Sequence, residues 1–87
     1  LRSNSDDPRS HYYVGQCYFR LGQFDEAAKS LKKALNISPD DALTHFALGL
    51  TYIELKKFRS AGNELNILYM LDRALFDSLN VRLGDKP

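Results

Sequence analysis

The chain has 87 residues, the size of a single domain. Hydrophobic residues make up 44% of it, and 12 basic against 11 acidic residues leave a net charge of +1. So balanced a charge provides no bulk field to attract nucleic acid or an anionic membrane. We therefore expect a folded protein that has no nucleic-acid partner.

One cysteine, Cys17, excludes an internal disulfide and a cysteine-based zinc site, and it fits a reducing compartment such as the cytoplasm. No apolar run approaches the roughly 20 residues that span a bilayer, so we expect no membrane insertion. Residues 1–10 are mostly polar and predict no signal peptide. Because the first residue is not Met, we expect a piece of a longer protein.

The first predicted helix begins after Asp7, which suits an N-cap, with Pro8 in the first turn. Residues at spacings of four and three predict its core-facing side: Val14, Tyr18 and Leu21. Residues 22–23, Gly-Gln, predict a tight turn.

A second helix is predicted from Phe24, and Pro39 marks its end because proline cannot continue a helix. Its apolar face consists of Ala27, Leu31, Ala34 and Leu35. A third helix is expected over about residues 41–55 and a fourth over 58–71, joined by a turn at Lys56-Lys57. A last helix follows Asp72, a predicted cap, and stops at Gly84. Its apolar face consists of Leu75, Leu79 and Leu83.

Shifting the sequence by 34 residues aligns segment 8–41 with segment 42–75. Seven positions are identical: His11/His45, Gly15/Gly49, Tyr18/Tyr52, Leu21/Leu55, Phe24/Phe58, Ala27/Ala61 and Leu31/Leu65. The small residues are expected where the two helices of each segment cross, Gly15 with Ala27 and Gly49 with Ala61. Each segment therefore reads as one helix-turn-helix unit.

This pattern resembles the tetratricopeptide (TPR) repeat, whose signature positions are Val14-Gly15-x-x-Tyr18, Ala27, Leu31, Ala34 and Pro39 in the first segment. The second segment has Leu48-Gly49-x-x-Tyr52, Ala61, Leu65 and Leu68, and then Arg73 where the family has proline.

The resemblance implies an all-α fold with two repeats, 8–41 and 42–75, in a right-handed superhelical stack. Residues 73–83 are expected to form a C-terminal capping helix that covers the last repeat. Residues 1–7 read as the tail of a preceding repeat or a disordered lead-in, and residues 84–87 as a tail.

The resemblance also implies that the first helix of each repeat lines a concave surface. The positions carried over are Arg9, Tyr12, Gln16, Phe19 and Arg20, then Leu43, Phe46, Leu50, Ile53 and Glu54. The predicted partner-binding residues are Tyr12, Gln16, Phe19, Leu43, Phe46, Leu50 and Ile53, which are not expected to pair the helices of a repeat.

We predict a protein-binding scaffold that receives a partner peptide or helix on this surface. Two alternatives are that the capping helix covers these residues and that the repeats self-associate into a homo-oligomer. The Lys and Asn clamp with which some family members hold a C-terminal carboxylate is absent, so chaperone tails are not expected as ligands.

Enzyme chemistry is not predicted. His11 and His45 lie one repeat apart with no acid or cysteine placed to complete a site, and we expect them to be half-buried packing residues. No Gly-rich phosphate loop is present, and no metal or cofactor is expected. A weak alternative is a nucleic-acid surface on a basic strip, Lys29, Lys32, Lys33, Lys56, Lys57 and Arg59, interrupted by Asp25, Glu26 and Glu64.

Overall fold

A computed structural model describes residues 7–84, and this part of the chain is all-α. Its five helices are α1 (Pro8–Arg20), α2 (Phe24–Ile37), α3 (Ala42–Glu54), α4 (Phe58–Leu71) and α5 (Arg73–Gly84). They confirm the predicted fold class and the order of the elements. The expected tails at residues 1–6 and 85–87 lie outside the described residues.

Two aspartates begin helices as the sequence predicts. The Asp7 carboxylate accepts a hydrogen bond from the backbone N–H of Arg9 at 2.9 Å, and Pro8 occupies the first turn. Asp72 accepts one from the backbone N–H of Leu75 at 3.1 Å, at the start of α5. Such caps satisfy donors that the helix itself leaves free, and each is worth about 1 kcal/mol.

The two tight turns occupy equivalent positions in the 34-residue repeat. Gly22 has φ +78°, in the left-handed region, and Lys56, its counterpart, has φ +62°. Glycine takes this conformation without penalty, whereas a side chain crowds the following carbonyl. The second turn is therefore strained where the first is not.

This pair of turns predicts opposite effects of exchanging the two residues. Gly22→Lys should lower the free energy of unfolding by about 1 kcal/mol, because the left-handed conformation disfavours a Cβ atom. Lys56→Gly should raise it by a smaller amount, since glycine also gains freedom in the unfolded chain. Chemical denaturation of both variants checks the signs, and a destabilised Lys56→Gly protein would contradict the account.

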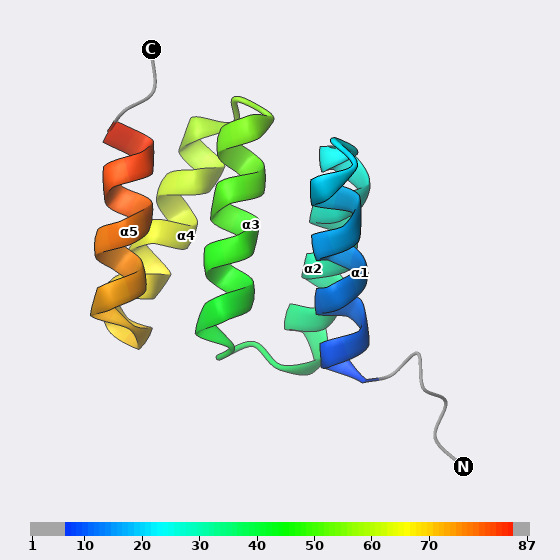
Figure 1. Cartoon of the computed structure of the whole chain (residues 1–87). Helices are drawn as coiled ribbons and strands as arrows, with labels where there is room; N and C mark the ends of the chain where they lie inside the picture. Colours follow the sequence, from blue (N-terminus) through cyan, green and yellow to red (C-terminus); the bar gives the residue numbers. More distant parts are fainter. Residues whose placement is uncertain (1–6, 85–87) are drawn as a thin grey trace.

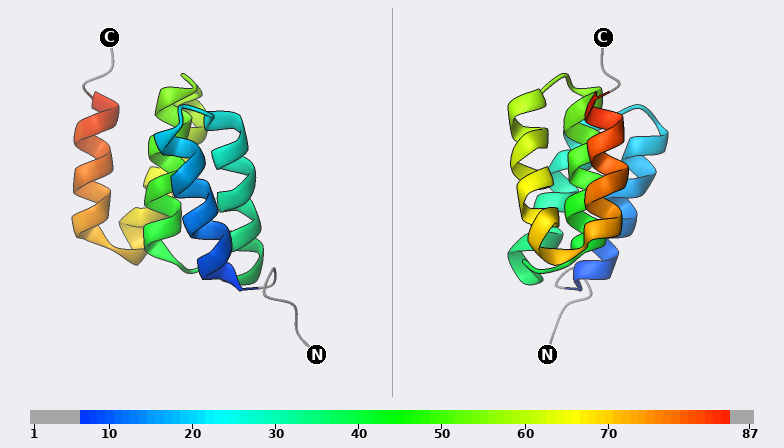
Figure 2. Two further views of the ribbon diagram at one scale, coloured as in Figure 1. Left: turned by 45° about the vertical axis from the view of Figure 1, so that its right-hand side comes forward. Right: turned by 90° about the vertical axis from the view of Figure 1, so that its left-hand side faces the viewer.

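The helices pack in two rows. α1, α3 and α5 lie along one side of the molecule, and α2 and α4 lie behind them (Figures 1 and 2). α1 packs on α2, α3 packs on both α2 and α4, and α5 packs on both α4 and α3. Each helix therefore packs against its sequence neighbour, and the short turns between them lie at the ends of the helices (Figure 1).

The core follows the predicted apolar faces of α2 and α5. Ala27, Leu31 and Ala34 of α2 are buried, and Leu35 packs against the same core. In α5, Leu79 is fully buried, and the flanking residues of its predicted face are half-buried. α5 thus covers α3 and α4, as expected of a capping helix.

The predicted core face of α1 is wrong for two of its three residues, since only Tyr18 is half-buried. Val14 is 46% exposed and Leu21 is 69% exposed, while Leu48, the counterpart of Val14, is 2% exposed. The difference has a simple cause: α3 has α2 lying against this face, whereas no helix of residues 7–84 lies against the same face of α1. Identical repeat positions therefore have different environments.

The two repeat glycines also differ in what they contact. A Cβ at Gly15 would lie 2.8 Å from Leu31 Cγ and 3.3 Å from the carbonyl oxygen of Ala27, so Gly15 does allow the close crossing of α1 and α2. A Cβ at Gly49 would instead lie 2.6 Å from Leu79 Cδ2 of α5. Gly49 thus makes room for the last helix and not, as predicted, for a crossing with Ala61.

Candidate partner-binding groove

A cavity of about 190 Å³ lies between α1 and α3. We call it the α1–α3 groove, and it is lined by Gly15, Gln16, Phe19, Leu31, Phe46, Ala47, Leu50 and Thr51. Leu31 comes from α2 and is buried, so it closes the inner end of the groove. Most of this lining is apolar, which suits the docking of a nonpolar side chain.

Four of the seven predicted partner-binding residues meet in this groove. Gln16 and Phe19 reach it from α1, and Phe46 and Leu50 reach it from α3. All four are half-buried, so each keeps part of its surface open to solvent. The helix spacing carried over by resemblance therefore brings side chains from two repeats into one concave site.

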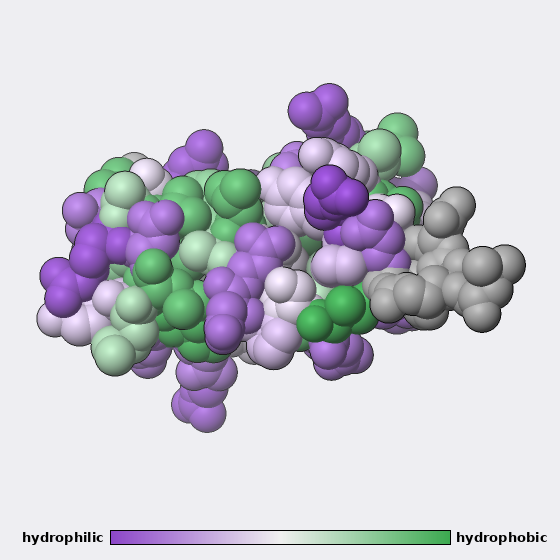
Figure 3. All heavy atoms as spheres, turned by 90° about the horizontal axis from the view of Figure 1, so that it is seen from below, coloured by the Kyte–Doolittle hydropathy of each residue, from purple (hydrophilic) through white to green (hydrophobic). Residues whose placement is uncertain are grey.

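The other three predicted residues lie elsewhere. Leu43 is 54% exposed, at the start of α3 and outside the groove. Apolar side chains gather on the half of the molecule formed by α3, α4 and α5, viewed from the end where α3 begins (Figure 3). Tyr12 and Ile53 pack against the hydrophobic core cluster. These two side chains thus support the fold more than they present a surface to a partner.

Phe19 corrects the expectation that the groove residues do not pair helices. Its ring packs edge-to-face on Phe24 of α2, with centroids 5.1 Å apart. The contact holds the Phe19 ring at one side of the groove. Phe19 therefore serves both the α1–α2 pairing and the lining of the site.

The polar groups of the groove are largely satisfied within the chain. Gln16 Nε2 donates to the Tyr12 hydroxyl at 2.6 Å, and the Thr51 hydroxyl donates to the Ala47 carbonyl oxygen at 2.8 Å. The side-chain carbonyl oxygen of Gln16 has no hydrogen-bond partner within residues 7–84 and is free to accept one. The groove thus offers an apolar seat with one amide at its edge.

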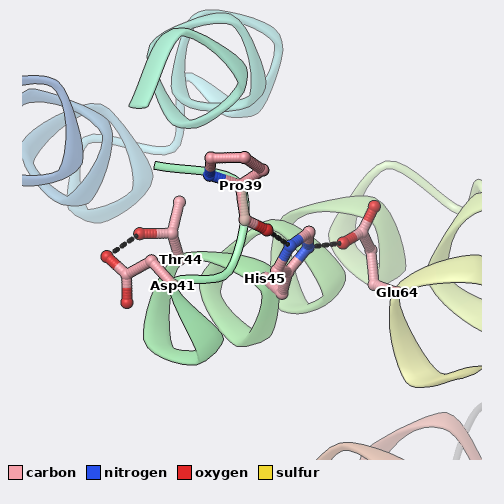
Figure 4. Close-up of polar contacts among 5 residues, drawn as sticks. All are labelled: Pro39, Asp41, Thr44, His45 and Glu64. Atoms are coloured by element: carbon pink, nitrogen blue, oxygen red, sulfur yellow. Dashed lines mark hydrogen bonds and ion pairs between the residues drawn. The ribbon is translucent and has the colours of Figure 1, made fainter. Parts of the chain in front are cut away.

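A buried polar site that the sequence did not predict centres on His45 (Figure 4). Its Nδ1 lies 2.6 Å from Glu64 Oε1 of α4, and its Nε2 lies 2.7 Å from the carbonyl oxygen of Pro39, between α2 and α3. The side chains of His45 and Glu64 are 8% and 12% exposed. The expectation that no acid lies near the histidines is wrong for His45.

The two contacts of His45 define where its protons sit. A carbonyl oxygen only accepts, so Nε2 carries a proton and donates it to Pro39. A second proton is shared between Nδ1 and Glu64 Oε1, either as an imidazolium on a carboxylate or as a carboxylic acid on a neutral ring. The network therefore ties the α2–α3 loop, α3 and α4 together through one side chain.

The sequence of α4 contains a signal that could have indicated the contact of Glu64 with His45. Ala61, Glu64 and Leu68 are all buried and follow one another at spacings of three and four. An acidic residue within an apolar stripe requires a partner, because an isolated buried charge is costly. The counterpart of Glu64 in the first repeat is Ser30, so His11 has no equivalent acid.

Other chemistry finds no support among residues 7–84. No group of three or more His, Cys, Asp or Glu in this range could hold a metal ion. The basic strip is mixed, since Asp25 and Glu26 share one surface hollow with Lys29, Lys32 and Lys57. Glu64, however, is buried and does not interrupt the strip as predicted. None of the described helices combines the length and the apolar character needed to cross a membrane.

A comparison with protein families gives one match. The model of the family described as TPR repeat matches residues 15–56, from the middle of α1 to the turn after α3. This match, over 42 of the 87 residues, supports the assignment of the chain to the TPR repeat family. TPR repeats generally mediate protein–protein interaction and are typically non-catalytic scaffolds. A comparison with curated proteins gives no significant match.

Proposed function

We propose that this TPR chain is a non-catalytic scaffold that binds a segment of a partner protein in the α1–α3 groove. The observation that carries the proposal is the apolar cavity itself, in which Phe19, Phe46 and Leu50 stand around the buried Leu31. A partner side chain that enters it removes apolar surface from water at about 25 cal/mol per Å². The binding segment is therefore expected to present one large nonpolar side chain.

The polar groups near the groove would determine how the bound partner segment is oriented. The Gln16 amide at the edge of the cavity accepts from a backbone N–H of the partner, which orients the segment without adding a charge. Arg9 already faces Asp7 at 3.6 Å, and both side chains are well exposed, so this pair adds little to affinity. Affinity is thus expected to come mainly from the nonpolar side chain.

Peptides selected from a random phage library on the folded chain test this proposal. Phe46→Ala should weaken the selected peptides by about 2 kcal/mol, roughly thirtyfold, as expected when a central aromatic contact is removed. The matched control is Leu43→Ala, which removes an exposed side chain outside the groove and should leave affinity unchanged. Equal affinity for wild type and a folded Phe46→Ala protein would contradict the proposal.

The molecular mass of the protein in solution distinguishes self-association from partner binding. Light scattering coupled to size-exclusion chromatography should give a monomer for both wild type and Phe46→Glu. An oligomer that Phe46→Glu separates into folded monomers would mean that the groove holds a second copy of the chain. That result would replace the scaffold proposal by homo-oligomer assembly.

A further inference from the structure

A second hollow, of about 420 Å³, lies between the first half of α2 and the end of α3. The start of α2 and the α3–α4 turn lie at the same end of the molecule (Figures 1 and 2). We call it the α2–α3 hollow, and it is lined by Asp25, Glu26, Ala28, Lys29, Lys32, Tyr52, Leu55 and Lys57. None of these residues lines the α1–α3 groove, so the hollow is a separate feature built from both repeats.

The floor of this hollow is apolar and packed. Ala28 and Tyr52 are 7% and 8% exposed and belong to one hydrophobic core cluster. Leu55 is half-buried and packs against the same cluster. The floor is therefore a fixed part of the α2–α3 packing and does not depend on exposed side chains.

The Tyr52 hydroxyl is a polar group that the fold does not use. It has no hydrogen-bond partner within residues 7–84. In the same range no fully buried side-chain nitrogen or oxygen lacks a partner, so this hydroxyl must reach the surface although nine-tenths of Tyr52 is buried. Because Tyr52 lines the α2–α3 hollow, its phenol O–H is available there to an incoming acceptor.

Three lysines line the same hollow, Lys29 and Lys32 on α2 and Lys57 after the α3–α4 turn. The Lys32 ammonium lies 5.8 Å from the centroid of the Tyr52 ring, a cation–π contact that places this charge beside the phenol. None of the three forms an ion pair with an acid within residues 7–84. Ammonium groups only donate hydrogen bonds, so three of them with a phenol suit an oxyanion.

The acids of the hollow limit how much negative charge it accepts. Asp25 and Glu26 also line it, so three lysines against two carboxylates leave one net positive charge. One carboxylate balances that charge. A nucleic-acid strand carries a phosphate about every 3.4 Å and would place further phosphates beside the two acids. The charges therefore favour a single acidic side chain.

An adjoining hollow of about 330 Å³ extends the site toward the start of α2. It is lined by Gly22, Gln23, Phe24, Asp25, Glu26 and Leu55, of which the last three also line the α2–α3 hollow. This second part has two acids and no lysine, so it favours a cation. In an extended segment, side chains two residues apart point to the same side, roughly 7 Å apart. An acid and a base at i and i+2 can therefore enter the two parts together.

We propose that the α2–α3 hollow binds an acidic side chain of an extended partner segment, with a basic residue two positions away over Asp25 and Glu26. The Tyr52 O–H and the lysine ammonium groups donate to the carboxylate. Tyr52 lies two residues beyond Leu50, which is about 200° around α3 at 3.6 residues per turn. The site thus faces away from the α1–α3 groove and does not depend on a partner there.

Titration of the full chain with a short peptide, followed by amide chemical shifts, tests this site. The probe is acetyl-Gly-Asp-Ala-Lys-Gly-amide, whose blocked ends leave charge only on its side chains. It should shift the amides around Tyr52 and Lys57, and Asn in place of its Asp should weaken binding by about tenfold. Lys29→Glu in the chain should weaken the Asp peptide similarly. The matched control is Lys33→Glu, an exposed lysine of α2 outside the hollow, which should leave affinity unchanged.

Two further variants locate the binding. Tyr52→Phe removes only a hydroxyl without a partner, so the protein should stay folded by circular dichroism and bind the peptide about threefold more weakly. Phe46→Ala should leave affinity unchanged, which separates this site from the groove. Absence of shifts around Tyr52 and Lys57 at saturating peptide would overturn the proposal. So would equal affinity for the Asp and Asn peptides, or tighter binding of a single-stranded oligonucleotide, which would make the hollow part of a nucleic-acid surface.

Discussion

Replacing His45 with leucine should lower the free energy of unfolding by about 3–5 kcal/mol, because it leaves the Glu64 carboxylate buried without a partner. The carboxylate lies 2.6 Å from the ring in the native fold, and both side chains are nearly inaccessible to water. An 87-residue domain has a stability of roughly 0.05–0.15 kcal/mol per residue. The loss is thus a large part of the total, and chemical denaturation followed by far-UV circular dichroism measures it.

Three companion variants show whether the pair, and not the volume of the ring, causes the loss. His45→Leu with Glu64→Leu removes both partners of the buried polar pair and should recover much of the stability. Glu64→Gln should cost only about 1 kcal/mol, since its amide N–H can donate to Nδ1 while Nε2 still donates to Pro39. His11→Leu, at the equivalent position without an acid, should change stability by about 0.5 kcal/mol. A double variant as unstable as His45→Leu alone would refute the pairing argument.

Local signals predicted the helices well. Asp7 and Asp72 have oxygens that cap helices, Gly22 suits a left-handed turn, and Pro39 cannot continue a helix. Each of these effects depends on the chemistry of one residue and its immediate neighbours. They are therefore legible in the sequence without knowledge of the packing.

Exposure was harder to predict, because it depends on neighbours that a single helix does not specify. Val14 and Leu48 occupy the same repeat position, yet only Leu48 has α2 against it. The periodicity of apolar residues shows which side of a helix can be buried. It does not show whether another element is present to bury it.

The groove was predicted only in part, and the reason is related: side-chain placement also depends on neighbouring helices. Helix spacing placed Gln16, Phe19, Phe46 and Leu50 on the inward side, and they do line one cavity. It could not show how deeply Tyr12 turns toward the core, nor that Phe19 packs on α2. Those outcomes depend on side-chain rotamers and on the space between helices. The His45–Glu64 contact was missed because it joins residues 19 apart on different helices.

Truncating Leu79, the buried side chain through which α5 packs on α3, should have the second large effect on stability. Leu79 of α5 is fully buried and lies over Gly49 of α3. Leu79→Ala should therefore lower the free energy of unfolding by about 2–5 kcal/mol through lost burial and the cavity left behind. Amide hydrogen exchange should show the loss most strongly in α5, because that helix packs on α3 mainly through this face.

The glycine beneath the leucine makes the prediction sharper. Gly49→Ala alone should cost about 1–3 kcal/mol, because its methyl group would lie 2.6 Å from Cδ2 of Leu79, a side chain that is fully buried. When Leu79→Ala is also present, the added methyl group fills part of the cavity. The double variant should therefore lose less free energy of unfolding than the sum of the two single losses, by about 0.5–3 kcal/mol. Gly62→Ala is the matched control: nothing lies within 4 Å of its Cβ position, and it should stabilise α4 by about 0.5–1 kcal/mol. Strict additivity of Gly49→Ala and Leu79→Ala would mean that the two residues do not share one contact, and that α5 is held to α3 elsewhere.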